Sequence, residues 1–225
     1  MFKSWRHVFK LDPNKSISDR DLEHICKSGT DAIIIGGSDG VTVENVKHLL
    51  SRVKVYNLPV ALEVSNTDIA VSGFDLYMIP TVLNSNKTEW ILGNHIEAIK
   101  KYGYLLEFIN YTVEGYVVIN KNSKVAQLTD AKCDITEEDI VAYAQVCEKI
   151  LKLPIMYIEY SGTFGDFNLI REAASRLNNT HLFYGGGISN GEQALEMSKY
   201  ANTVVVGNII YEDIKLALET VEYVK

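Results

Sequence analysis

Two glycine-bearing turns near the C-terminus constrain the fold of this chain more than any other feature. One lies in 183–189 and the other in 204–208, and each follows a short apolar run and leads into an amphipathic stretch. Glycine lets backbone N–H groups approach an anion closely, and a helix start adds the positive end of a dipole. In a (β/α)8 barrel, a phosphate site is typically built from the loops after strands 7 and 8. The tandem pair predicts such a barrel.

The rest of the chain alternates in the same way. Most of the apolar runs are β-branched or aromatic, are bounded by turn residues, and are separated by stretches with helical spacing. We expect strands at His7–Leu11, Ala32–Ile35, Val60–Glu63, Leu76–Ile79, Tyr116–Ile119, Ile155–Glu159, His181–Tyr184 and Thr203–Val206. No linker composition interrupts the 225 residues, so we expect one α/β domain over 1–225, a single TIM barrel.

One connection departs from the regular barrel. Only 12 residues, 64–75, separate the third and fourth strands, and several of them favour turns. A crossover helix hardly fits in this length. We therefore expect the third helix of the ring to be missing or replaced, which leaves a gap in the outer layer.

Composition narrows the function classes. The formal net charge of -7 argues against a generic nucleic-acid binder. The three cysteines show no metal-binding spacing, which is typical of a reducing compartment. The first residues lack the apolar region of a signal peptide, and no stretch approaches 18 apolar residues. These features predict a cytoplasmic protein.

Charged residues at the end of the first strand are candidates for chemistry. Strand alternation places Val8, Lys10 and Asp12 on one face. If this face points inward, a cation and a carboxylate enter the barrel mouth together, where barrel enzymes carry their active sites. The alternative is a structural ion pair at a strand end.

The sixth strand places Tyr157, Glu159 and Ser161 on one face. A glutamate in an apolar strand is costly unless it meets a donor, and it would suit a base that draws a proton from a substrate hydroxyl. The alternative is a glutamate held by a buried arginine or lysine. Glu63, at the end of the third strand, is expected to be structural.

Two further features complete the candidates. The glycine-rich turn 36–40 after the second strand can approach an anion or a metal-bound phosphate, or it can be an ordinary loop.

The five histidines form no metal-binding pattern and receive no role. His24, His48 and His95 are expected on helix surfaces, and Ser189 is expected to cap the helix after the seventh strand.

Taken together, the segments 5–13, 35–40, 157–162, 184–188 and 206–208 resemble the prenylglyceryl phosphate synthase family. The resemblance covers essentially the whole chain, with the motifs in the family's order. It is closest to the bacterial branch, the heptaprenylglyceryl phosphate synthases. The missing third helix also resembles that family's modified barrel.

This resemblance implies an ether-forming prenyl transfer that requires Mg²⁺. The 3-hydroxyl of sn-glycerol 1-phosphate would attack C1 of a long all-trans prenyl diphosphate and release diphosphate. Asp12 and Ser38 would hold Mg²⁺, and Tyr157 and Glu159 would act in the chemistry. The residues implied in binding glycerol 1-phosphate are Lys10, Tyr157, Ile158, Glu159, Tyr160, Ser161, Gly162, Gly187, Gly207 and Asn208.

Two expectations concern partners and the lipid chain. The aromatic-rich stretch 102–108 would cover apolar surface in a homodimer, and transient contact with a membrane surface would deliver the lipid. The helix expected over 87–102 would form one wall of a prenyl groove, with the small residue Ala98 leaving it open for a seven-isoprene chain. The alternative is that alanine stands at position 98 only because it favours helix formation.

Other functions remain open. A phosphate-sugar isomerase would need an acid and a base on opposite strands, and the run 116–119 offers no carboxylate at its end. A Schiff-base aldolase would need an inward lysine on the sixth strand, where Glu159 stands. A catalytically silent barrel that binds a protein partner would predict a broken site.

Overall fold

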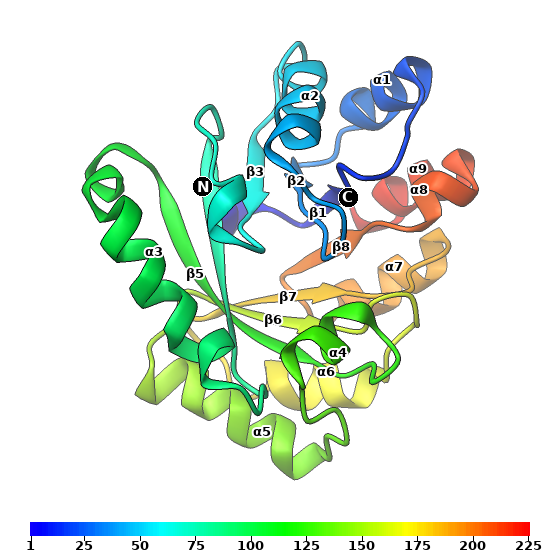
Figure 1. Ribbon diagram of the computed structural model, residues 1–225. Coiled ribbons are helices and arrows are strands. Elements are labelled where there is room, and N and C mark those ends of the chain that lie inside the picture. Colours follow the sequence, from blue (N-terminus) through cyan, green and yellow to red (C-terminus); the bar gives the residue numbers. More distant parts are fainter.

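The computed structural model describes residues 1–225, and its centre is a closed barrel of eight parallel strands (Figure 1). The chain order of the strands is also their order around the barrel, and β8 pairs with β1 to close it. The strands are β1 (His7–Leu11), β2 (Ala32–Ile35), β3 (Val60–Glu63), β4 (Leu76–Val82), β5 (Tyr111–Val118), β6 (Ile155–Glu159), β7 (His181–Gly185) and β8 (Thr203–Val206). The expected TIM barrel is confirmed, although β4 ends three residues later and β5 begins five residues earlier than predicted.

Helices cover the outside of the barrel. They are α1 (Asp19–Lys27), α2 (Val43–Val53), α3 (Asn94–Tyr102), α4 (Lys124–Thr129), α5 (Glu137–Gln145), α6 (Phe167–Ala174), α7 (Gly191–Ser198), α8 (Ile209–Glu212) and α9 (Ile214–Val224). Short turns of helix complete the chain at η1 (Phe2–Ser4), η2 (Thr67–Ile69), η3 (Glu89–Gly93), η4 (Gly103–Phe108) and η5 (Val146–Ile150). None of them has the length and apolar character needed to cross a bilayer.

Local sequence signals account for most helix starts. Ser18 accepts a hydrogen bond from the backbone N–H of Asp21, and Thr136 forms a capping box with Asp139. The helix after β7 is an exception. Asn190, not Ser189, caps α7, while the N–H and hydroxyl of Ser189 both donate to Gln193.

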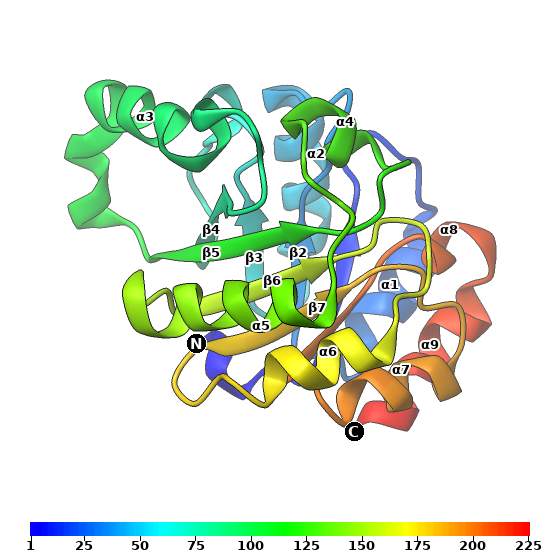
Figure 2. The same ribbon diagram turned by 90° about the horizontal axis from the view of Figure 1, so that it is seen from below.

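The gap predicted in the helix ring is confirmed. The single turn η2 connects β3 to β4, and no crossover helix covers this side of the barrel. Figure 2 shows α3 standing apart from α5, with the long strand β5 running between them. The layer of helices is therefore incomplete over β3 and β4.

Alternation along each strand creates two separate cores. Val8, Ile34 and Tyr157 belong to the core inside the barrel, whereas Phe9 and Ile158 pack in the core between strands and helices. Since Val8 points inward, Lys10 does as well. The face shared by Val8 and Lys10 is therefore the inward one, which the sequence left open.

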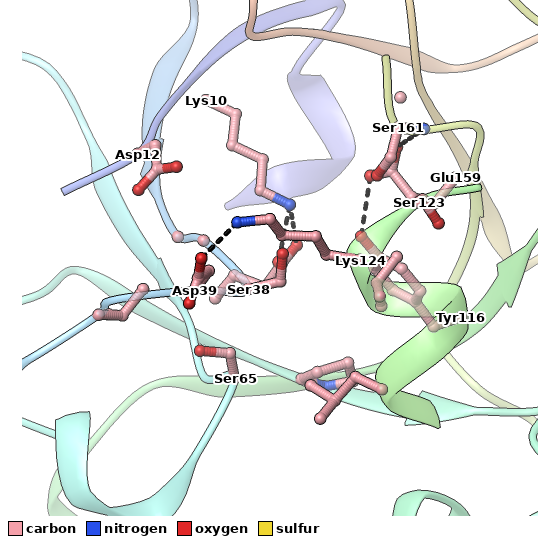
Figure 3. Close-up of a pocket in the computed structure, with 18 of the residues that line it drawn as sticks. Lys10, Asp12, Ser38, Asp39, Ser65, Tyr116, Ser123, Lys124, Glu159 and Ser161 are labelled. Atoms are coloured by element: carbon pink, nitrogen blue, oxygen red, sulfur yellow. Dashed lines mark hydrogen bonds and ion pairs between the residues drawn. The ribbon is translucent and has the colours of Figure 1, made fainter. Parts of the chain in front are cut away.

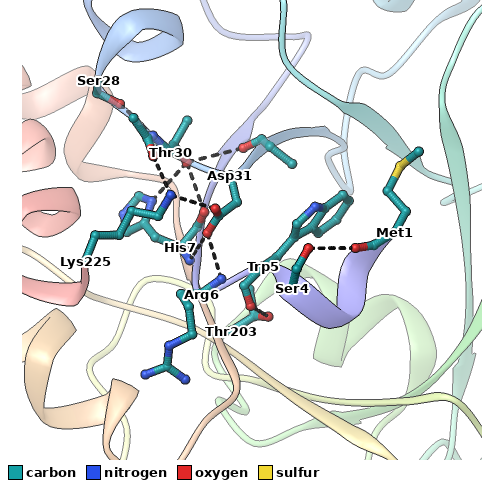
Figure 4. A network of polar contacts seen from close by, with 12 residues as sticks. Met1, Ser4, Trp5, Arg6, His7, Ser28, Thr30, Asp31, Thr203 and Lys225 are labelled. Carbon is teal, nitrogen blue, oxygen red and sulfur yellow. Dashed lines mark hydrogen bonds and ion pairs between the residues drawn. The ribbon is translucent and has the colours of Figure 1, made fainter.

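A polar network lies at the N-terminal ends of the strands (Figure 4). Trp5 is buried there as part of the inner core. His7 is buried between two hydroxyl groups, with Nδ1 3.0 Å from Thr30 Oγ1 and Nε2 2.9 Å from Thr220 Oγ1. The carboxylate of Asp31 accepts hydrogen bonds from two backbone N–H groups and from the ammonium of Lys225. Trp5 fills the interior at this closed end, and the cavity opens at the opposite end.

Candidate active site

A cavity of about 920 Å³ opens at the C-terminal ends of the strands (Figure 3). All eight strands or the loops that follow them contribute to its lining, as expected for the mouth of a TIM barrel. Most of the residues proposed from the sequence line this cavity: Lys10, Asp12, Ser38, Ala98, Tyr157, Glu159, Ser161, Gly162, Gly187, Gly207 and Asn208. The fold therefore brings together positions that are nearly 200 residues apart.

Lys10 makes a close ion pair with a glutamate of another strand. Its Nζ lies 2.7 Å and 2.8 Å from the two carboxylate oxygens of Glu63. Burial alone would lower the pKa of Lys10, but the carboxylates of Glu63 and Glu159 outweigh it and raise that pKa. Lys10 is thus a fixed cation inside the mouth, and Glu63 is the group that holds it.

Glu159 is held by neutral donors. Its Oε2 accepts a hydrogen bond from the hydroxyl of Tyr116 at 2.9 Å, and its Oε1 accepts one from the backbone N–H of Ser161 at 2.6 Å. Burial raises the pKa of Glu159, while Lys10 and the backbone N–H of Ser161 act in the other direction. No arginine or lysine pairs with it directly, so the alternative of a purely structural ion pair does not hold here.

Glu114 is a second buried carboxyl that the sequence did not reveal. It points into the barrel from β5, is completely buried, and neither of its oxygens has a hydrogen-bond partner. Burial, followed by the charge of Glu63, raises the pKa of Glu114 well above its ordinary value. The expected start of this strand at Tyr116 left Glu114 outside it. The two-residue spacing from Tyr116 was the signal that could have found it.

Two tyrosines form one wall of the inner site. The rings of Tyr116 and Tyr157 stack with centroids 4.6 Å apart, and the ammonium of Lys10 lies 5.5 Å from the centre of the Tyr157 ring. The Tyr157 hydroxyl is buried without a partner, and burial raises its pKa well above the ordinary value. This wall offers an electron-rich face to a positive group.

The turn after β7 requires glycine, but for a reason different from the one its sequence suggested. Gly186 and Gly187 have φ values of 143° and 56°. A Cβ on Gly187 would lie 2.1 Å from the backbone nitrogen of Phe164, inside the loop after β6. Packing of one loop against another therefore demands Gly187.

The turn after β8 is different. A Cβ on Gly207 would meet only the backbone oxygen of Lys10, at an ordinary 3.6 Å. The side-chain oxygen of Asn208, which follows it, accepts a hydrogen bond from the ammonium of Lys15 at 3.0 Å. Gly207 thus has space beside it that the fold itself does not use.

Two of the proposed binding residues point away from the cavity. The side chains of Ile158 and Tyr160 lie in the outer core, as strand alternation requires. Only their backbone groups remain for contact with a ligand. Ser161 and Gly162 follow them in a turn with positive φ values of 22° and 79° and do line the cavity.

Asp12 and Ser38 are suited to a hard cation. Asp12 Oδ1 accepts one hydrogen bond, from the backbone N–H of Asn14 at 2.9 Å, and the carboxylate forms no ion pair. Ser38 is exposed at the rim of the cavity. No group of three or more His, Cys, Asp or Glu side chains gathers as a metal site. Mg²⁺ often takes one or two protein oxygens and completes its shell with water and phosphate, so the donors present fit this ion.

The cavity extends toward α3 through the gap in the helix ring. Asn94, His95 and Ala98 line it from this helix, and Trp90 lines it from η3. His95 is therefore not the surface residue expected from the sequence: its Nε2 lies 3.1 Å from the backbone oxygen of Pro80. The opposite face of this region is exposed and apolar, with Leu92, Ile96, Ile99, Tyr104 and Phe108 each more than two fifths accessible.

Comparison with known proteins points to one family. The model of the PcrB family matches residues 1–225. The chain is 58% identical over 221 residues to heptaprenylglyceryl phosphate synthases of Bacillus cereus and Bacillus mycoides, covering 98% of this chain and 96% of each relative.

The fold is similar to that of (S)-3-O-geranylgeranylglyceryl phosphate synthase from Thermoplasma acidophilum, a crystal structure in complex with its substrate sn-glycerol-1-phosphate. The TM-score is 0.87 at 22% identity, over 99% of this chain and 94% of that one. At this identity the likeness concerns the fold alone.

Proposed function

Because the chain belongs to the PcrB family and is a prenyltransferase, we propose that it joins a heptaprenyl group to sn-glycerol 1-phosphate. The prenyl group would come from its diphosphate and form an ether with the 3-hydroxyl of the glycerol. One observation supports this most. A single cavity combines glycine turns after β7 and β8, a buried carboxylate at Glu159, and an extension along α3 that Trp90 and Ala98 help to line.

The phosphate of glycerol 1-phosphate would lie against the turns after β7 and β8. Backbone N–H groups at such turns bind phosphate well, and the open space beside Gly207 lets a ligand approach closely. Asn208, Ser161 and Gly162 would complete this side. The ammonium of Lys10 would add a positive charge from the barrel interior.

Glu159 would orient the 3-hydroxyl and accept its proton. The glycerol oxygen forms a bond to C1 of the prenyl chain, the bond from C1 to the diphosphate oxygen breaks, and the proton moves to Glu159. A base works best when its pKa approaches the working pH, and the upward pKa shift caused by burial acts in this direction. The faces of Tyr157 and Tyr116 would stabilise positive charge developing at the allylic C1.

Asp12 and Ser38 would hold Mg²⁺ next to the leaving group. When bound, the ion would neutralise charge that builds on the departing diphosphate. Asp12 is suited to this role because its carboxylate is not engaged by a cation of the protein.

The chain-length preference would be set along α3. Ala98 is a small residue that lines the cavity from this helix, so the groove beside it stays open. Burying a CH₂ group is worth about 0.8 kcal/mol, so three additional isoprene units add enough to set the preference even after chain entropy is subtracted.

The exposed apolar face of η4 and α3 would support a homodimer of a cytoplasmic enzyme, with transient contact at a membrane surface for lipid exchange. Tyr104 and Phe108 are 70% and 79% exposed, which is unusual for large apolar side chains on a free surface. Light scattering at micromolar concentration tests the dimer.

Product analysis tests the proposed reaction. Radiolabelled glycerol 1-phosphate is incubated with the four-isoprene or the seven-isoprene diphosphate, with Mg²⁺ or with excess EDTA. We expect a labelled ether lipid only with Mg²⁺, and more of it with the longer chain. Ala98→Trp should reverse this preference, and absence of any ether product would refute the function.

A further inference from the structure

An ion pair spans the mouth of the cavity and has no role in the reaction described above. It joins Lys124, the first residue of α4, to Asp39 in the loop after β2. Figure 3 shows the lysine side chain reaching across the pocket to this carboxylate. The two residues come from elements on either side of β3 and β4, the sector from which the helix is missing. The pair therefore crosses the part of the mouth that leads to α3.

The pair is exposed, with 70% of the Lys124 side chain and 63% of the Asp39 side chain accessible to solvent. Exposed ion pairs contribute little net stability, because water screens them and both side chains lose freedom. Such a pair opens easily when a better partner arrives. A diphosphate is a better partner for an ammonium than one carboxylate, since it carries more charge and more acceptor oxygens.

The other two lysines of the cavity belong to β1 and the loop that follows it, away from the sector of β3 and β4. The lining contains three lysines and no arginine. Lys10 is buried against Glu63, and Lys15 donates to Asn208 and lies over the ring of Tyr211. Five carboxylates also line the cavity: Asp12, Asp39, Glu63, Glu89 and Glu159. A trianionic ligand entering this negative mouth needs a cation that can be released, and Lys124 is the one held by an exposed carboxylate alone.

We propose that Lys124 binds the diphosphate of the prenyl substrate and that Asp39 pairs with Lys124 until the substrate arrives. Substrate entry exchanges one ion pair for another: the ammonium leaves Asp39 and moves to a diphosphate oxygen. Ser38 is next to Asp39 in the loop after β2, across the pocket from α4, so Lys124 and the proposed metal ligands would reach the diphosphate from different sides. After bond cleavage, return of Lys124 to Asp39 favours release of the diphosphate. This inference rests on the proposed function.

The test separates the two substrates. The probe is geranylgeranyl diphosphate, the four-isoprene substrate. Lys124→Gln should raise the KM for this probe about tenfold or more, since it removes a charge-assisted contact. The Kd of glycerol 1-phosphate, measured by calorimetry, should stay within about twofold, because its phosphate lies at the turns after β7 and β8. Asp39→Asn should lower the KM for geranylgeranyl diphosphate about threefold, since it removes the competing carboxylate.

Lys121→Gln is the matched control, because Lys121 is an exposed lysine in the loop before α4 and is absent from the cavity lining. It should leave both constants unchanged. The double variant Asp39→Asn with Lys124→Gln should behave like Lys124→Gln alone, because Asp39 acts through the lysine. Calorimetry with inorganic diphosphate and Mg²⁺ should reproduce the order of affinities without turnover.

The outcomes separate a failure of the proposed function from a failure of the proposed ion-pair exchange. A wild-type enzyme that forms no ether lipid refutes the proposed function. If the wild type is active but Lys124→Gln keeps its KM for geranylgeranyl diphosphate, the exchange is refuted. A KM that rises in Asp39→Asn also overturns it, since Asp39 would then assist binding directly instead of competing for the lysine.

Discussion

The two ends of the barrel both bury polar side chains, but they satisfy them differently. At the closed end, both ring nitrogens of His7 have hydroxyl partners, and Asp31 accepts three hydrogen bonds. At the mouth, Glu114 and the hydroxyl of Tyr157 are buried with no partner. Three glutamates, Glu63, Glu114 and Glu159, are buried in or below the mouth, and only Glu63 pairs with the ammonium of Lys10.

This difference separates stability from function along one barrel axis. A buried polar group without a partner costs free energy of folding, so it persists where a ligand or a reaction uses it. The closed end has no such groups in its network and should matter for stability alone. The mouth contains the unpartnered groups that reduce stability, and it should matter for binding and turnover. Each of the following experiments tests one side of this contrast.

The largest effect is expected at Glu159. Glu159→Gln keeps the size of the side chain but removes the base, so kcat should fall roughly 10²–10⁴-fold. The melting temperature and the Kd of glycerol 1-phosphate should change little. Single-turnover product formation and calorimetry measure these quantities. A fall in kcat of less than about threefold would show that Glu159 is a structural residue, and it would contradict the proposed difference between the two ends.

His7 should show the opposite behaviour. His7→Ala leaves a cavity and removes two buried side-chain hydrogen bonds, and it should lower the free energy of unfolding by about 2–4 kcal/mol. The folded fraction should keep the kcat and KM of the wild type. Urea denaturation and steady-state kinetics at 15 °C provide the measurements. A changed KM would show that the closed end communicates with the mouth.

Acid should weaken the closed end through the same histidine. Burial lowers the pKa of His7 from 6.5 to about 3, so the unfolded chain binds a proton that the folded chain refuses. Stability from this group is complete above pH 6.5 and is lost as the pH falls toward 3. The stability difference between wild type and His7→Ala should therefore shrink by about 2 kcal/mol between pH 7 and pH 5. A difference independent of pH would contradict a neutral, buried imidazole.

Gly207 tests whether free space at the mouth serves a ligand. Gly207→Ala should fold normally, since the added Cβ meets only one atom at an ordinary distance. It should raise the Kd of glycerol 1-phosphate about tenfold, because the methyl group keeps the phosphate from the backbone. Gly187→Ala is the contrasting variant and should lose thermal stability first. Unchanged affinity in Gly207→Ala would remove this turn from the phosphate site.

The smallest effect concerns Glu114. Its pKa is raised in the folded state, so the folded protein keeps a proton that the unfolded chain releases above about pH 4.3. Stability therefore falls as the pH rises beyond that value, and Glu114→Gln abolishes this loss. At pH 8 the variant should be more stable by on the order of 1 kcal/mol, with no gain at pH 4. Denaturation at both pH values measures the free energy of unfolding. A Glu114→Gln variant that is less stable than the wild type at pH 8 would show that the carboxylate stabilises the fold, contrary to this prediction.

Much of the fold was predictable because its signals are local. Strand alternation in 7–11 and 155–159 correctly oriented Lys10 and Glu159, and the short connection 64–75 correctly predicted the missing helix. Capping residues such as Ser18 were found because a side chain that bonds its own helix start acts within a few residues. The error at Ser189 was small, since Asn190 beside it is an equally good cap.

The partners of the charged groups were not predictable in this way. Periodicity, turn residues and segment length were enough to predict the barrel, the residues that share a strand face and the missing helix. Assembly of the whole barrel was needed to show that Lys10 meets Glu63, that Glu114 is left without a partner and that Gly187 is required by the loop after β6. Such contacts join residues that are far apart in the chain. They arise from strand register and barrel closure, which no local pattern encodes.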